Sequence, residues 1–168
     1  MSSSAHRRLR AAMSKLQVKR GKIVKITVEQ AVNSTRALEH LNTACVFEQG
    51  LGIAFALASN EVVKVVKAYA EERQKLAKNF AKRDENDKPM KRIVVTREGE
   101  QEIFDMDDDA QERFNEANKA ALAQQVEVNV SPVLRSQLAK EKLPGFVYAT
   151  LDWLIVAEVP KPAPAEAA

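Results

Sequence analysis

The 168-residue sequence predicts an α+β fold that is mainly α. We expect a long antiparallel helical hairpin, with a small antiparallel β-sheet and short helices at one end. Residues 52–83 carry apolar side chains at the helical period, and residues 28–41 show the same pattern over a shorter stretch. Strict alternation of apolar and polar residues over 125–130 indicates a strand and supplies the β part of the prediction.

The shorter helix is predicted to begin at a capping box. The Thr27 hydroxyl can accept from the amide of Gln30, and the Gln30 side chain can reach back to the amide of Thr27. Before this box, residues 22–27 alternate apolar and basic side chains, which is typical of a short strand or an extended lead-in. Asn42 and Thr43 are plausible residues for ending the helix.

The long helix has one apolar stripe and one charged face. The stripe residues recur three or four positions apart with a single gap at Glu72; they are Ala58, Val62, Val65, Tyr69, Leu76 and Phe80. A helix of about 30 residues is roughly 45 Å long, so the shorter helix can cover only part of it. The uncovered part needs another element of this chain, a second copy or a foreign partner.

Strand patterns follow the charged turn at 83–89. Residues 92–96 and 101–104 are predicted to form a hairpin with a four-residue loop at 97–100. Residues 107–124 are predicted to be a helix, whose acidic start suits the positive end of the helix dipole.

The last part of the predicted domain holds two further short helices. Ser131 and Pro132 are expected to cap a helix that runs to about residue 140. For residues 148–158 a helix is favoured over a strand, with its apolar residues on the buried side.

Charge and composition divide the chain into three parts. Residues 1–21 are expected to be a flexible basic arm, 22–158 a single domain, and 159–168 a disordered Pro/Ala tail. Residues 1–26 hold eight basic residues and no acidic one. The remaining 18 basic and 23 acidic residues give the rest of the chain a net charge of −5. Translation could also start at Met13 instead of Met1.

The basic arm offers one functional hypothesis, which is binding to the phosphates of a nucleic acid. No aromatic residue is interleaved with the basic ones, so base stacking is not expected. The candidate phosphate-binding residues are Arg7, Arg8, Arg10, Lys19, Arg20 and Lys22.

The sequence offers few groups for catalysis or metal binding. Asp105, Asp107, Asp109 and Glu116 fit part of a calcium-loop template, but Ala110 replaces the glycine that the loop needs. Helix capping explains these acidic residues equally well. The single cysteine, Cys45, has no set of ligands around it. We therefore expect no catalytic residue, no metal and no cofactor.

Three stretches, in their order along the chain, resemble a group of small proteins encoded by tailed bacteriophages and prophages. They are KAYAEERQKLAKNF at 67–80, VEVNV at 126–130 and LPGFVYATLDWLI at 143–155. The resemblance covers about 25–158 and depends on composition and position. It implies a genomic context and a shape, but no activity.

These observations favour a non-catalytic protein that takes part in assembly. It would bind itself, as a coiled-coil-like oligomer, or a phage or host protein along the exposed stripe of the long helix. The expected anchors are Val62, Val65, Tyr69 and Leu76, unless the monomer covers them itself. No apolar run approaches the length of a membrane span, so we expect a cytoplasmic protein without a membrane partner; a place in the virion is the alternative.

Overall fold

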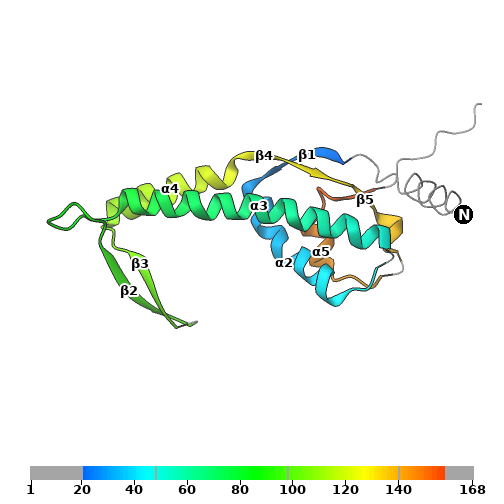
Figure 1. The fold of residues 1–168 in the computed structure, drawn as a ribbon, viewed down its shortest axis with the longest axis horizontal. Helices are drawn as coiled ribbons and strands as arrows, with labels where there is room; N and C mark the ends of the chain where they lie inside the picture. The colour runs from blue at the N-terminus through cyan, green and yellow to red at the C-terminus, as the bar shows by residue number, and fades with distance from the viewer. Residues whose placement is uncertain (1–20, 48, 98, 140, 158–168) are drawn as a thin grey trace, which may run out of the picture. The chain divides into compact units, whose positions relative to one another are not determined.

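The structure is a computed structural model that describes residues 21–157 apart from residues 48, 98 and 140 (Figure 1). In this part of the chain the fold is α+β and mainly α, as the sequence predicts. The described residues form two compact units. The first contains 21–24, 36–61 and 127–157, and the second contains Lys25–Thr35 and Val62–Val126.

Four elements run from one unit into the other. They are strand β1 (Lys22–Thr27), helix α2 (Val28–Ala44), helix α3 (Gln49–Phe80) and strand β4 (Gln125–Val130). Strands β1 and β4 are hydrogen-bonded neighbours in a two-stranded sheet. The antiparallel packing of α2 and α3 as one hairpin stays a prediction.

The first turn of α2 follows the predicted capping box. The Gln30 N–H donates to Thr27 Oγ1 at 3.1 Å, and the Thr27 N–H donates to Gln30 Oε1 at 2.9 Å. The helix then continues to Ala44, beyond the predicted stop at Asn42 and Thr43. The Thr43 hydroxyl donates to the carbonyl of Glu39 at 2.8 Å, so this residue lies within the helix instead of ending it.

The first unit has a well-buried apolar core. The ring of Phe55 on α3 is fully buried and lies 5.0 Å from the ring of Phe47. Strand β5 (Val133–Leu134) pairs in parallel with strand β6 (Ile155–Val156). The chain between these strands forms the 3₁₀ helix η1 (Arg135–Leu138) and the helix α5 (Gly145–Thr150).

The two short helices predicted near the C-terminal end are wrong in their extent. Residues 133–134 and 155–156 form a ladder, and the Val133 N–H donates to the carbonyl of Leu154 at 2.9 Å. Pairing between segments distant in the sequence therefore overrides the local helical pattern. The burial prediction is confirmed, since Leu151, Leu154 and Ile155 are all buried.

In the second unit, helix α4 (Asp108–Ala123) packs along the later half of α3 in the opposite direction (Figure 1). The Tyr69 hydroxyl donates to Asn118 Oδ1 at 2.9 Å, and the guanidinium of Arg73 lies 5.8 Å from the ring centre of Phe114. Asp107 caps α4 by accepting from the N–H of Ala110 at 2.8 Å. Helix α4 is thus the additional cover that the long helix requires.

Strands β2 (Lys91–Thr96) and β3 (Gly99–Phe104) form an antiparallel hairpin in the same unit. Thr96 is opposite Gly99, so the loop has two residues, and the predicted four-residue loop is wrong. Gly99 has a φ of +117°, which favours glycine and allows the chain to re-enter the ladder so early. At the base of the hairpin, the Asp105 carboxylate lies 3.5 Å from Lys82 Nζ and 3.8 Å from Arg92 Nε.

Candidate functional site

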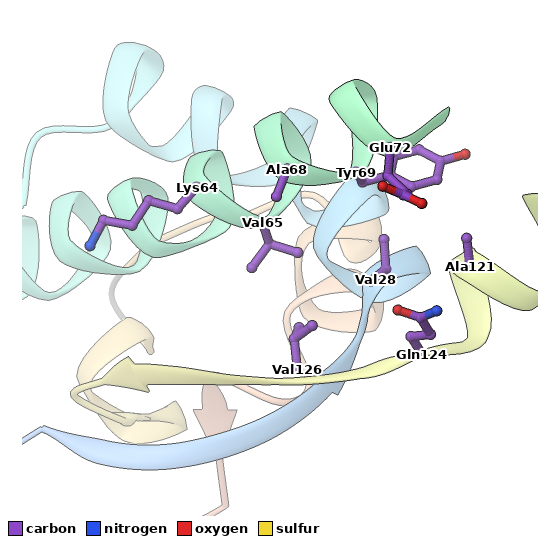
Figure 2. Close-up of a pocket in the computed structure, with 9 residues that line it drawn as sticks. All are labelled: Val28, Lys64, Val65, Ala68, Tyr69, Glu72, Ala121, Gln124 and Val126. Carbon is purple, nitrogen blue, oxygen red and sulfur yellow. The ribbon is translucent and has the colours of Figure 1, made fainter. Parts of the chain in front are cut away.

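The second unit contains an open groove of about 500 Å³. It lies between α3, the end of α4 and the beginnings of α2 and β4 (Figure 2). A volume of this size is typical of sites that bind a ligand or a partner's side chains. The lining residues are Val28, Lys64, Val65, Ala68, Tyr69, Glu72, Ala121, Gln124 and Val126.

One wall of the groove comes from the helical period of α3. Five of its residues fall three or four positions apart or next to each other, so they share one side of the helix: Lys64, Val65, Ala68, Tyr69 and Glu72. Tyr69 is held by its hydrogen bond to Asn118 of α4. This bond fixes the ring at the point where α3 and α4 meet.

The opposite wall forms where α4 ends. The Gln124 N–H donates to the carbonyl of Ala121 at 3.2 Å, and the Gln124 carbonyl accepts from the Val28 N–H at 2.9 Å. The second of these bonds joins the end of α4 to the start of α2. Ala121 has a small side chain, which leaves space beside α3. Val126, the second residue of β4, then completes this wall.

The middle of the groove is apolar, and its two ends carry opposite charges. Figure 2 shows Val65 and Val126 pointing toward each other, with Lys64 at one end of the lining residues and Glu72 at the other. Glu72 also lies 4.0 Å from Lys75, in an exposed ion pair. Ion pairs of this kind contribute little, so the carboxylate can interact with another cation.

The lining of the groove is mainly apolar. None of the nine lining residues is a histidine, cysteine or serine. A groove with an apolar middle and with a lysine and a glutamate at its ends can accommodate one or two apolar side chains of a polypeptide.

The four predicted anchors differ in how exposed they are and in whether they line the groove. Val65 and Tyr69 are half-buried and line the groove. Leu76 is half-buried and lies outside the lining set. Val62 is 1% exposed, so a partner cannot reach it and it cannot act as an anchor.

Sequence reasoning missed the wall opposite α3. Val28, Ala121, Gln124 and Val126 come from three separate elements, and no local pattern brings them together. The one available signal was the small size of Ala121 within the helix predicted at 107–124. A small residue on a helix allows either close packing or an open space.

The residues of the nucleic-acid hypothesis are largely outside the described part of the chain. The residues outside the described part are Arg7, Arg8, Arg10, Lys19 and Arg20. Lys22 is described, and it is exposed on β1.

The acidic residues of the calcium template serve other purposes in the structure. Asp107 caps α4, and Asp105 lies near Lys82 and Arg92. No group of three or more potential metal-ligating side chains occurs among the described residues. In the first unit, burial raises the pKa of the Cys45 thiol, and the negative charge of Glu141 raises this pKa further.

Comparison of the chain with family models, with curated proteins and with solved structures gave no match. Within the described residues, no helix combines the length and the apolar character that crossing a membrane requires.

Proposed function

We propose that this protein is a non-catalytic interaction protein that binds an apolar segment of a protein partner in the groove on α3. The observation that carries this proposal is the groove itself, which has an apolar middle and opposite charges at its ends. The sequence resemblance to proteins of tailed bacteriophages and prophages adds only a context, in which the partner would be a phage or host protein.

The energetics of the groove are consistent with this role. Covering half-buried residues such as Val65 and Val126 removes more of their apolar surface from water. Each apolar side chain that a partner fully buries contributes roughly 1.5–3 kcal/mol, before the entropy cost of association. A partner that inserts two such side chains gains about 3–6 kcal/mol, so contacts at the rim must offset the entropy cost and supply the rest of the roughly 8 kcal/mol that micromolar binding requires.

Site-specific photocrosslinking in cells that carry the native gene tests the proposal. A photoreactive benzoylphenylalanine would replace Ala68, which is exposed on the groove side of α3. The matched control replaces Ala70, which is exposed on a different side of the same helix. We expect protein adducts of defined mass from position 68, insensitive to nuclease, and none from position 70.

The purified partner from those adducts allows a quantitative check. Ala68→Arg places a long charged side chain in the groove and is expected to weaken binding at least tenfold, about 1.4 kcal/mol. Ala70→Arg makes the same change away from the groove and should leave the Kd unchanged. Equal adducts at both positions, or equal Kd values for both variants, would contradict the proposal.

A second candidate function has its basis in the N-terminal sequence, where residues 1–26 contain eight basic residues and no acidic one. A protein that binds nucleic acid through these residues should lose affinity steeply as salt is added. Deleting residues 1–21 should abolish this binding while the domain still folds. Binding that persists after the deletion would exclude this version, and fluorescence anisotropy with a labelled duplex measures it.

A further inference from the structure

The β2–β3 hairpin, residues 91–104, presents apolar side chains to solvent. Ile93 is 68% exposed and Val95 is 76% exposed. An isolated two-stranded hairpin is marginally stable in water, and hairpins usually pack on a helix or a third strand. Along most of its length, this hairpin has exposed residues on both faces. We call it the β-arm.

The register of the β-arm places its exposed apolar residues on one face. Ile93 is opposite Glu102 and Val95 is opposite Glu100, and residues opposite each other in an antiparallel pair point to the same side. Lys91 is on this face as well, and its Nζ lies 2.7 Å from Glu102 Oε2. The face therefore carries Ile93 and Val95 with Glu102 and Glu100 opposite them, and Lys91 at the base of the β-arm, where it pairs with Glu102.

We propose that the β-arm of one copy of this protein lies in the α3 groove of a second copy. This inference rests on the proposed function and names the partner, which is another copy of the same chain. Ile93 and Val95 would occupy the apolar middle of the groove, next to Val65 and Val126. None of the described residues of the β-arm lines the groove of its own chain, so the groove is open to the β-arm of another.

The charges and their spacing identify the occupant. Lys64 and Glu72 are eight residues apart on α3, which is about 12 Å along a helix. Lys91 and Val95, whose partner is Glu100, are four residues apart on β2, which is about 14 Å along a strand. A β-arm that lies along α3, with β2 running opposite to the helix, can therefore place Glu100 at Lys64 and Lys91 at Glu72; Ile93 then lies midway between them, and Val95 lies level with Glu100.

Reciprocal exchange of β-arms would close the assembly as a dimer with two equivalent contacts. The same contact repeated in one direction would give longer assemblies. Both arrangements bring residue 93 of one copy close to residue 68 of another.

Disulfide crosslinking between single-cysteine variants tests this contact. Cys45→Ser removes the only native cysteine. In that background, Ile93→Cys protein is mixed with Ala68→Cys protein and oxidised. We expect a mixed disulfide between the two variants, and none when Ala70→Cys replaces Ala68→Cys. Equal crosslinking at positions 68 and 70, or none at either, would overturn the proposal.

Light scattering after size exclusion gives a second, independent measurement. The wild-type protein should exceed the 18.7 kDa mass of one chain. The double variant Ile93→Thr/Val95→Thr and the single variant Ala68→Arg should each reduce the mass to one chain. Ile103→Thr changes an apolar residue on the other face of the same hairpin and should not. Mixing the β-arm variant with Ala68→Arg should restore association, because one intact β-arm then meets one intact groove.

The outcomes separate this inference from the proposed function. A monomeric wild-type protein, or association that neither variant disturbs, overturns the exchange of β-arms. If a foreign partner still binds wild-type protein and loses affinity for Ala68→Arg, the proposed function holds while this inference fails. If position 68 yields adducts only with copies of this protein, both hold.

Discussion

The two halves of α3 share one apolar period but differ in burial. In the earlier half, Phe55 and Ala58 are completely buried. In the later half, Val65, Tyr69 and Leu76 are half-buried, and the groove opens beside the first two of these. The comparison shows that an amphipathic period predicts which side of a helix faces inward, whereas the neighbouring elements determine how completely that side is covered.

The largest expected effect is on stability in the buried half. Phe55→Ala removes a fully buried ring that packs on Phe47, and should lower the free energy of unfolding by about 3–5 kcal/mol. Phe80→Ala, in the later half, removes a half-buried ring and should lower it by roughly 1–2 kcal/mol. Urea denaturation measures both values. Equal losses would remove the distinction between the two halves.

The N-terminal cap of α4 provides a test of the later half of α3, because α4 is the main element that covers this half. Asp107→Ala removes the side chain that accepts from the Ala110 N–H, and should destabilise α4 by about 1 kcal/mol. Asp107→Asn keeps an acceptor and should cost only a few tenths of that. If α4 holds the later half in place, amide hydrogen exchange over 65–80 should accelerate in the alanine variant and remain unchanged over 53–58.

A smaller effect is expected in the β-arm. The ion pair between Lys91 and Glu102 is exposed, so Glu102→Gln should reduce stability by at most about 0.5 kcal/mol. Amides of β2 and β3 should nevertheless exchange faster than those of α3, because few buried contacts support them. Slow exchange in the β-arm of the wild-type protein that becomes fast on dilution would instead indicate protection by a second copy.

The smallest effect concerns Cys45, which precedes the buried half of α3. Its raised pKa reduces the thiolate fraction at pH 8, so alkylation by iodoacetamide should be slower than in the unfolded chain. Glu141→Gln removes the lesser cause and should increase the rate by less than about tenfold. Because the pKa is higher in the folded state, the associated stabilisation is present at low pH and is lost as pH rises through that pKa.

Local patterns predicted the elements whose signals lie within one turn or one strand. The box of Thr27 and Gln30, the alternation over 125–130 and the cap region of α4 are all found as expected. The strands at 133–134 and 155–156 could not be found this way, because two residues are too few to show a period. Pro132, a good first residue for a helix, indicated the wrong element there.

The candidate site was predicted only in part. Val65 and Tyr69 belong to the apolar stripe, so the helical period identifies them. Whether they are covered depends on where α4 ends and on the size of Ala121, which are properties of the packed unit. The opposite charges at Lys64 and Glu72 are visible in the sequence, but a helix of this composition has many charged residues and the period alone does not select these two.

The bond from the Val28 N–H to the Gln124 carbonyl has a consequence for synthesis on the ribosome. It joins residues 96 positions apart, so the opposite wall of the groove forms only after nearly the whole domain has been translated. Until then the apolar stripe of the later half of α3 is open to solvent. Nascent chains on neighbouring ribosomes of one messenger RNA would be vulnerable to premature association through this stripe, and slow elongation before codon 124 should increase aggregation.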